Sequence, residues 1–421
     1  MIRLLAAVVF VALATATACA EPTGAALPGL SVYDDVMLSL LKKWDVPGAS
    51  LVVAQGDRLV LARGYGLANR ERAVPVEPTS LFRLASLSKT ITAVAVLQLV
   101  DDERLELDDK VLPLLGAAGP RPNKIADKRV HDITVRHLLQ HAGGFDRARS
   151  GDVVFMPHAL DATRRQRGPL PPDCPTILRD TLERKLDFVP GERFAYSNVG
   201  YCILGRIVER VTGKRYETYV RERILAPAGA TRMKLGRTLE AADGEVTYYE
   251  SDGRQVTAMP GLGLRTAPQP YGGFAMETMD SYGGWIGAPI DYLRFILAID
   301  GWRGRALLTS ETSAQMATAS RLPSEADADD DLGARGGRYG LGLRLTQGRS
   351  GVNRWHTGSL PGTSTLAIRT ADGFAWVVAF NGRPKERNAF RGEVDRGLWT
   401  AKDKVQTWPD GNLFERSEAG R

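Results

Sequence analysis

Residues 82–89 read FRLASLSK and run directly into TITAVAVLQLV at residues 90–100, an apolar segment long enough for a buried helix. Ser86 and Lys89 are three residues apart, so on one helical turn the lysine ammonium faces the serine hydroxyl. Ser86 also lies where this helix begins, and there unpaired backbone N–H groups and the helix dipole favour developing negative charge. A serine hydroxyl is a weak nucleophile unless a base, such as a partly buried lysine, activates it. The stretch therefore predicts a nucleophilic serine with a lysine as its base.

Two other motifs accompany this stretch. They matter because the Ser-x-x-Lys spacing alone is weak evidence: Ser39 and Lys42 share it, and there we expect only a surface lysine. The other motifs are YSN at residues 196–198, which precedes an apolar helix, and HTGS at residues 356–359, which leads toward a strand beginning near residue 365. A tetrahedral intermediate needs a nucleophile, a proton shuttle and two hydrogen-bond donors, and the three segments can supply them.

In this order the three motifs resemble those of the serine hydrolases of the class C β-lactamase type. That family includes β-lactamases, D-alanyl-D-alanine carboxypeptidases and penicillin-binding proteins, D-aminopeptidases and β-lactamase-like esterases. Flanking segments are similar too: LLQHAGG at residues 138–144, YCILGR at 201–206 and GGW at 283–285. The resemblance extends over about residues 31–400. It implies an α+β, β-lactamase/transpeptidase-like fold, in which helices flank a mainly antiparallel sheet and an all-helical domain is inserted.

The resemblance implies a role for each residue of the first two motifs. Ser86 would be the nucleophile that is acylated. Lys89 and Tyr196 would share the general-base and general-acid work, and the sequence leaves open which of them holds the proton at each step. Asn198 would orient Lys89 and bind the substrate. The backbone N–H groups of Ser86 and Ser359 would form the oxyanion hole.

The third motif departs from the family at His356. Penicillin-binding members usually carry Lys here, and its ammonium holds the substrate's carboxylate. A neutral imidazole keeps a hydrogen bond but lacks the fixed charge, although an arginine from elsewhere in the chain could replace it. We expect His356, Thr357 and Gly358 to line the substrate site.

These residues predict an exported serine hydrolase that acts through an acyl-enzyme on Ser86, with no metal and no cofactor. The expected substrates are small molecules or peptides, either esters or D-amino-acid peptides and amides. A true β-lactamase or penicillin-binding D-alanyl-D-alanine carboxypeptidase is the alternative within this class. An alternative of another class is a catalytically silent protein that binds cell-wall peptides, against which the intact Ser86, Lys89 and Tyr196 argue.

Strand-like segments lie at both ends of the chain, with helical segments between them. The pattern predicts a sheet domain from residues 21–104 and 280–405, a helical domain with loops at 105–279, and a polar C-terminal tail at 406–421 whose last dozen residues are frayed. Helices are predicted at residues 31–44, 90–100, 133–140, 176–186, 200–211, 216–224 and 388–400. Strands are predicted at residues 49–54, 58–64, 340–346, 365–369 and 374–380.

The first twenty residues predict a secretory signal peptide. Arg3 precedes an apolar run at residues 4–18, and Ala18-Cys19-Ala20 matches a small-residue cleavage site. The run is too short for a permanent membrane-spanning helix. Cys19 also fits a lipoprotein cleavage site, although Ala16 stands where such sites usually carry Leu, so the sequence leaves a lipid anchor at Cys19 open. Either way we expect a periplasmic or secreted protein.

Composition excludes several other classes. The 421 residues are 43% hydrophobic and 25% charged, which is ordinary for a globular protein and excludes a disordered or polytopic membrane chain. The net charge of +6 predicts a solvated basic surface rather than nucleic-acid binding, because no long basic run occurs. His137 and His141 share a helical face but have no third ligand, so we expect local bonds and no metal. Cys174 and Cys202 could form a disulfide in an oxidising compartment or stay as buried thiols.

Overall fold

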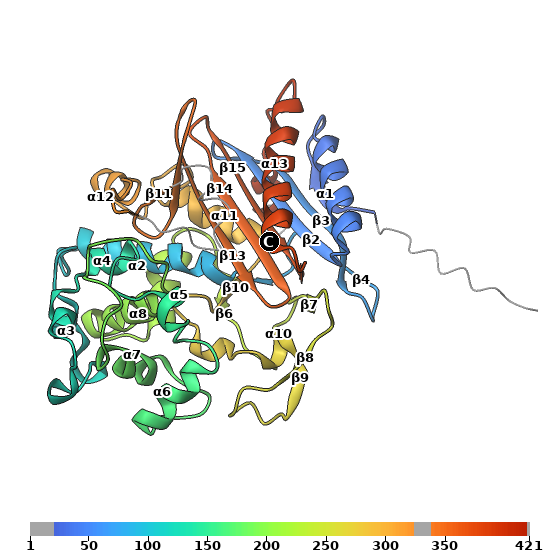
Figure 1. Cartoon of the computed structure of the whole chain (residues 1–421). Helices are drawn as coiled ribbons and strands as arrows, with labels where there is room; N and C mark the ends of the chain where they lie inside the picture. The colour runs from blue at the N-terminus through green and yellow to red at the C-terminus, as the bar shows by residue number, and fades with distance from the viewer. Residues whose placement is uncertain (1–20, 324–337, 419–421) are drawn as a thin grey trace, which may run out of the picture.

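A large antiparallel sheet takes its strands from both ends of the chain (Figure 1). The computed structural model describes residues 21–323 and 338–418, so the predicted leader with Cys19 lies outside the described residues. The strands of this sheet are β1 (Thr23–Ala26), β2 (Gly48–Gln55), β3 (Arg58–Asn69), β4 (Val74–Pro75), β11 (Arg338–Tyr339), β12 (Arg344–Gly348), β13 (Gly351–Leu360), β14 (Thr363–Arg369) and β15 (Phe374–Phe380). Their order is β1-β3-β2-β15-β14-β13-β12-β11, with β4 paired to β3. N-terminal and C-terminal strands therefore meet at β2 and β15.

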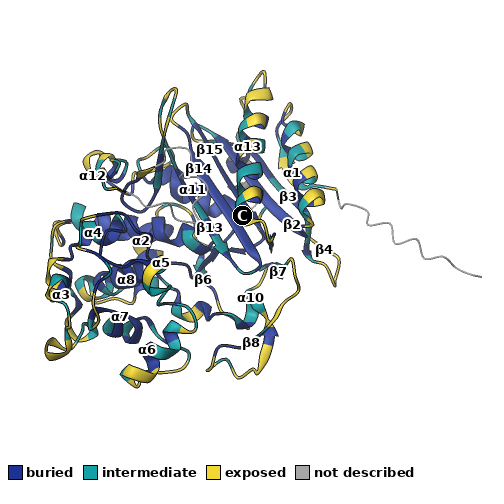
Figure 2. Ribbon diagram, viewed as in Figure 1, coloured by how far each residue is buried: buried dark blue, intermediate teal, exposed yellow. Residues whose placement is uncertain are grey.

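Helices cover both faces of this sheet, which explains why β15 is buried along its whole length (Figure 2). On one face Trp376 and Phe380 meet Trp399 and Phe390 of α13 (Arg387–Lys404), with ring centroids 5.0 Å apart in each pair. On the other face α11 (Pro289–Ala298) packs against β15 and β2. A strand covered on both sides reads as a continuous apolar run.

A group of helices lies at one end of the sheet and surrounds α2 (Figure 1). Helix α2 packs against α8, α9 and α12 as well as against the residues that precede it, and this contact on all sides matches its unbroken apolar sequence. Besides α11 and α13, the helices are α1 (Ser31–Trp44), α2 (Ser88–Asp101), α3 (Val111–Leu115), α4 (Val135–Leu139), α5 (Arg147–Ser150), α6 (His158–Gln166), α7 (Cys174–Leu182), α8 (Asn198–Thr212), α9 (Tyr216–Val220), α10 (Gln269–Gly272), α12 (Ser310–Met316) and α14 (Leu413–Glu418). The predicted helices and strands thus occur, with ends that move by a few residues.

Short strands connect the large sheet with the group of helices around α2. A three-stranded sheet joins β5 (Phe82–Arg83), β10 (Trp285–Gly287) and β6 (Lys234–Leu235). Two further pairs are β7 (Tyr249–Glu250) with β16 (Gly382–Arg383), and β8 (Gln255–Thr257) with β9 (Thr266–Pro268). The segment at residues 105–279 therefore contains short strands besides its helices. The domain boundaries themselves stay a prediction.

One predicted strand is displaced, and one expectation about the C-terminal tail is wrong. The strand predicted at residues 340–346 begins only at Arg344, because the chain turns at Gly342, where φ is +83°. A Cβ there would lie 2.1 Å from Cβ of Ala93 in α2, so only glycine fits. The expectation that the last dozen residues are frayed is wrong for residues 413–418, because α14 packs on β3 and buries Phe414 completely. No helix in residues 21–323 and 338–418 combines the length and the hydropathy that crossing a bilayer requires.

Candidate active site

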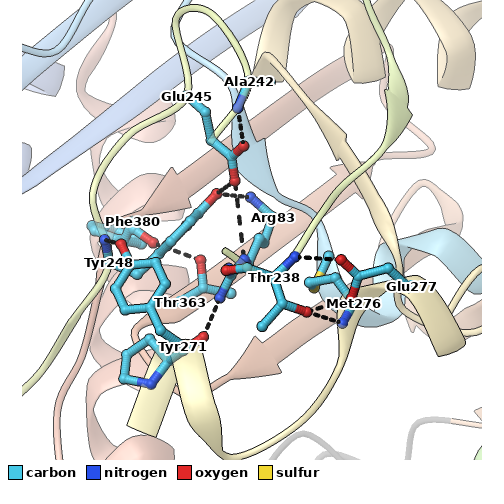
Figure 3. A network of polar contacts seen from close by, with 11 residues as sticks. Arg83, Thr238, Ala242, Glu245, Tyr248, Tyr271, Met276, Glu277, Thr363 and Phe380 are labelled. Carbon is cyan, nitrogen blue, oxygen red and sulfur yellow. Dashed lines mark hydrogen bonds and ion pairs between the residues drawn. The ribbon is translucent and has the colours of Figure 1, made fainter. Parts of the chain in front are cut away.

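A buried polar network anchors the strand that leads to Ser86 (Figure 3). The Arg83 guanidinium is 1% exposed, lies 4.2 Å from the ring centroid of Tyr248 and donates to the carbonyl of Pro270 over 2.6 Å. Its Nε is 4.0 Å from the carboxylate of Glu245, which accepts a hydrogen bond from Tyr248 Oη over 2.7 Å. Because the partners come from two other segments, around residues 245–248 and at Pro270, the network holds β5 in one position.

Ser86 lies in the turn Ala85–Leu87, which joins β5 to α2. The first residue of the turn has φ +51°, a left-handed conformation that costs a residue with a Cβ about 1–2 kcal/mol. Neighbours hold this conformation: Leu84 N donates to the carbonyl of Trp285 over 2.9 Å, and Leu84 O accepts from Thr365 Oγ1 over 3.1 Å. Strain of this kind collects at functional sites.

Lys89 is the second residue of α2, one helical turn after Ser86, and is fully buried. Its Nζ is 3.1 Å from Ser86 Oγ, 2.7 Å from Asn198 Oδ1 and 2.8 Å from the carbonyl oxygen of Tyr282. The structure therefore brings the predicted nucleophile and base into hydrogen-bond contact.

Burial changes the protonation of both candidate proton carriers. It lowers the pKa of Lys89 well below its usual value; nearby Asp152 opposes this and Arg147 adds to it. Burial also raises the pKa of Tyr196 to about 12, against a hydrogen bond with Ser86 and the charge of Arg147, which lower it. Both shifts act toward the neutral forms, an amine on Lys89 and a phenol on Tyr196.

The ring of Tyr196 is held from behind by His141. The two rings lie 4.3 Å apart, and Lys89 Nζ lies 5.0 Å from the centroid of the tyrosine ring. His141 Nδ1 accepts a hydrogen bond from the backbone N–H of Ser197 over 3.1 Å, so this histidine bonds across 56 residues of sequence rather than locally. The same Ser197 begins α8 as its N-cap.

Asn198 is the first residue of α8 and connects Lys89 to a carboxylate that the sequence did not reveal. Its Nδ2 donates to Asp152 Oδ2 over 2.6 Å, while its Oδ1 accepts from Lys89. Asp152 follows α5 in a loop, 46 residues before Asn198. No local pattern around Asp152 signals this contact.

His356 lies on β13 and uses both ring nitrogens within the protein. Nδ1 is 2.7 Å from the carbonyl oxygen of Thr357, which can only accept, so Nδ1 carries the proton. Nε2 then accepts from Tyr339 Oη over 3.0 Å. Burial lowers the pKa of His356 to about 3, helped by the charges of Arg344 and Lys89, so the ring is neutral. Both ring nitrogens are thus engaged within the protein, while His356 and Thr357 line a pocket together with Ser86.

Gly358 allows β13 to approach the turn Ala85–Leu87, which carries Ser86. A Cβ at Gly358 would lie 2.4 Å from Leu84 O and 2.3 Å from Thr365 Oγ1, so any other residue would displace the turn. The next residue, Ser359, lines the same cavity as Ser86. Gly358 thus lets β13 come close enough for Ser359 and Ser86 to line one cavity, and the oxyanion hole between their N–H groups stays a prediction.

A cavity of about 550 Å³ opens above Ser86. Its walls come from the three motifs, from the loop around α5 and from the end of β13. The lining residues include Ser86, Asp146, Arg147, Asp152, Arg193, Tyr196, Asn198, Tyr282, Ser359, Arg383 and Arg387. Asp146 and Arg147, which belong to none of the three motifs, thus lie at the site.

A smaller pocket of about 100 Å³ adjoins the cavity and is rich in arginine. It is lined by Ser86, Arg147, Tyr196, Arg344, His356, Thr357, Ser359, Arg387 and Arg391. Its guanidiniums come from α5, β12 and α13, which are far apart in the sequence. The sequence showed only that arginines are numerous, and the fold gathers these around the third motif.

Cys174 and Cys202 form a disulfide that joins α7 to α8, with their Cα atoms 6.0 Å apart. The sequence had left this pairing open. Across residues 21–323 and 338–418, no three His, Cys, Asp or Glu side chains come together as metal ligands.

Fold and site together define a serine hydrolase of the β-lactamase/transpeptidase type. A sequence model of the Beta-lactamase family matches residues 34–397, and the chain belongs to this family.

Individual proteins are similar to this chain in sequence or in fold. The chain is 37% identical over 144 residues to a probable fimbrial assembly protein FimD of Dichelobacter nodosus; the match covers 34% of this chain and 32% of that protein, so the chain spans only part of that curated relative. The solved structure of the octameric penicillin-binding protein homologue from Pyrococcus abyssi has a TM-score of 0.65 at 25% identity and covers 89% of this chain and 78% of that one. The D-amino acid amidase from Ochrobactrum anthropi SV3 has a TM-score of 0.67 at 21% identity, over 89% of this chain and 98% of that one.

Proposed function

We propose that the chain is an exported serine hydrolase that forms an acyl-enzyme on Ser86 and acts on esters or on D-amino-acid peptides and amides. The environment of Lys89 carries the proposal. Two of its neighbours, the side chain of Asn198 and the backbone of Tyr282, present carbonyl oxygens that can only accept. A neutral amine has two N–H donors and one lone pair. In the neutral amine that burial favours, the two carbonyls take both donors and leave the lone pair for the Ser86 hydroxyl, whereas in the ammonium the third N–H donates to Ser86 Oγ, 3.1 Å away.

The chemistry follows from this geometry. Lys89 takes the hydroxyl proton while Ser86 Oγ bonds to the substrate carbonyl carbon. The carbonyl oxygen becomes negative and is bound by the backbone N–H groups of Ser86 and Ser359. Tyr196, a neutral phenol in contact with Ser86, relays the proton to the leaving group, whose bond to the carbonyl carbon breaks. A water molecule, deprotonated by the same proton-carrying groups, then hydrolyses the ester on Ser86.

The arginine-rich pocket indicates that the substrate carries an anionic group. Arg344, Arg387 and Arg391 line it beside Ser86, while the neutral His356 adds no charge. A planar guanidinium binds a carboxylate with two parallel hydrogen bonds. Peptides with a free C-terminal carboxylate and carboxylate-bearing esters fit this pocket.

The first experiment is the release of p-nitrophenolate from a short-chain p-nitrophenyl ester before the steady state. A burst near one equivalent that is absent in Ser86→Ala supports an acyl-enzyme on Ser86. Esters, D-amino-acid amides and D-peptides, each with and without a carboxylate, then define the preferred class. Intact-mass labelling with a fluorophosphonate covers the case of a pocket that refuses the simple ester, and a wild-type protein that is neither acylated nor labelled would favour the silent binding protein.

A true β-lactamase or penicillin-binding carboxypeptidase is the second candidate. The positive charge beside Ser359 favours it, because β-lactams and D-alanyl peptides both carry a carboxylate. Stoichiometric acylation by a penicillin, followed by fast or slow release seen by intact mass, separates these activities from an esterase or amidase.

Export rests on the leader pattern at residues 1–20 and agrees with a disulfide between Cys174 and Cys202. The described residues lend no support to a lipid anchor at Cys19. The intact mass of the protein recovered after expression with its own leader reports cleavage and any attached lipid.

A further inference from the structure

Asp152 is an acidic side chain at the base of the cavity for which the proposed chemistry has no task. It lines the same cavity as Ser86, and its carboxylate accepts a 2.6 Å hydrogen bond from Asn198. Burial raises the pKa of this carboxyl, while Arg147, the bond from Asn198 and Lys89 lower it. The charged form of this half-buried carboxylate is therefore stabilised by specific partners.

The contact decides which way the Asn198 amide faces. A carboxylate only accepts hydrogen bonds, so the amide must turn Nδ2 toward Asp152 and Oδ1 toward Lys89. In the flipped orientation Oδ1 would face the negative carboxylate and Nδ2 would face the amine. Nδ2 could then donate to the lone pair of Lys89 that has to accept the proton of Ser86.

We propose that Asp152 is a positioning residue of this site, which fixes the Asn198 amide so that the lone pair of Lys89 stays directed at Ser86. Its negative charge also stabilises the protonated form of Lys89. The inference rests on the proposed function, because it concerns the base of that reaction. It assigns a task to a residue outside the three motifs.

Several other groups face Lys89 and contribute to its field. They are Arg147 from α5, His141 behind Tyr196, His356 on β13 and the neutral phenols of Tyr201 and Tyr282. Asp152 is the opposing charge that raises the pKa of Lys89, whereas Arg147 lowers it. Removing the carboxylate must therefore make Lys89 easier to deprotonate.

Two substitutions separate the hydrogen bond from the charge. Asp152→Asn can still present a carbonyl oxygen to Asn198 but has no charge, and Asp152→Ala has neither. The readouts are kcat and KM for the p-nitrophenyl ester, and the second-order rate of Ser86 labelling by a fluorophosphonate from pH 4 to pH 9. Asp161→Asn is the matched control, because Asp161 lies on α6 and pairs only outside the cavity, with Arg164 at 3.0 Å.

In both variants we expect the acid limb of the labelling profile to move to lower pH by about 1. At the pH optimum we expect Asp152→Ala to lose about 10- to 100-fold in kcat with KM nearly unchanged, the loss that follows removal of a charge-assisted hydrogen bond. Asp152→Asn should recover most of that loss, and Asp161→Asn should behave like the wild type.

Acid limbs that coincide with the wild type in both variants would overturn the inference, because a purely structural role lowers the rate without moving the limb. If Asp152→Ala does not fold, the limb of Asp152→Asn decides alone. A wild-type protein that is not labelled contradicts the proposed function instead. The pKa of Lys89, followed through its ¹³Cε resonance and assigned with Lys89→Ala, then still decides the inference: it must fall in Asp152→Asn.

Discussion

Lys89 is the residue on which the proposed chemistry depends most. Lys89→Ala should slow labelling of Ser86 by a fluorophosphonate about 10²- to 10⁴-fold, the usual contribution of a positioned general base. Intact-mass kinetics measure the rate. Lys42→Ala is the control, because Lys42 has the same Ser-x-x-Lys spacing but lies exposed on α1. A normal rate in Lys89→Ala would show that another group takes the proton.

Gly358 supports a second prediction about a single residue. The Cβ of Gly358→Ala would lie within 2.4 Å of Leu84 O, so the Ser86 turn must move away from β13. Because one oxyanion donor is then displaced, we expect kcat to fall about 100-fold or more, while the protein stays folded. Gly392→Ala on α13 is the control, where a Cβ meets only the mobile end of Arg396. Equal kcat values for Gly358→Ala and the wild type would contradict the close approach.

At the scale of elements, the disulfide between Cys174 and Cys202 ties α7 to α8, the helix that carries Asn198. It closes a loop of 28 residues' separation, for which the chain-entropy model gives about 3–4 kcal/mol. A reductant should therefore lower the midpoint of urea unfolding. The double variant Cys174→Ser/Cys202→Ser should start at the lower midpoint and ignore the reductant. A midpoint that the reductant leaves unchanged in the wild type contradicts a stabilising bond.

Helix α14 supports a prediction where the sequence pattern failed. Its Phe414 is fully buried against the sheet, so Phe414→Ala should cost about 3–5 kcal/mol of unfolding free energy. Glu415→Ala on the exposed side of the same turn should change it by less than about 0.5 kcal/mol. Denaturant unfolding measures both, and a Phe414→Ala protein as stable as the wild type would mean that the tail is frayed after all.

A local sequence pattern predicts an element well when the bounds of that element do not depend on which distant residues pack against it. The helix at residues 31–44 and the strand at 374–380 have the predicted bounds, because the periodic apolar positions of the one and the continuous apolar run of the other already indicate which side chains are buried. The strand predicted from residue 340 starts late because Gly342 must fit against Ala93, a contact across some 250 residues. The short tail helix escaped notice because only two of its residues are apolar.

Over the whole molecule, the motif residues could be predicted but their electrostatic surroundings could not. Ser86, Lys89, Tyr196 and Asn198 lie in recognisable local patterns, and the fold brings them together. Asp152 and the arginines of β12 and α13 reach the site only through tertiary packing, so no window of sequence contains the information. A composition with many arginines predicted a basic surface, whereas the structure concentrates part of that charge beside the nucleophile.

This concentration of charge predicts how activity depends on salt. Six arginines and two aspartates line the two pockets around Ser86 among the residues the structure describes. Two of these arginines pair with carboxylates, Arg193 with Asp146 and Arg383 with Glu250. We expect the guanidiniums beside Ser86 to attract an anionic substrate less strongly as the Debye length falls from about 20 Å to about 4 Å between 20 mM and 500 mM salt. We expect kcat/KM for a carboxylate-bearing ester to fall several-fold over this range, while its neutral isostere changes little.

Two arginine variants separate local charge from net charge. Arg387 lines both pockets, whereas Arg396 lies further along α13 and lines a different groove. Arg387→Gln and Arg396→Gln each remove one of the charges that make up the net +6, so an effect of net charge alone must be equal in both. We expect only Arg387→Gln to weaken the salt dependence and to lower kcat/KM for the anionic ester, since the field near Ser86 is short-ranged at moderate salt. If both variants respond alike, the arginines beside the nucleophile act merely as part of a basic surface, and the anionic substrate class must be abandoned.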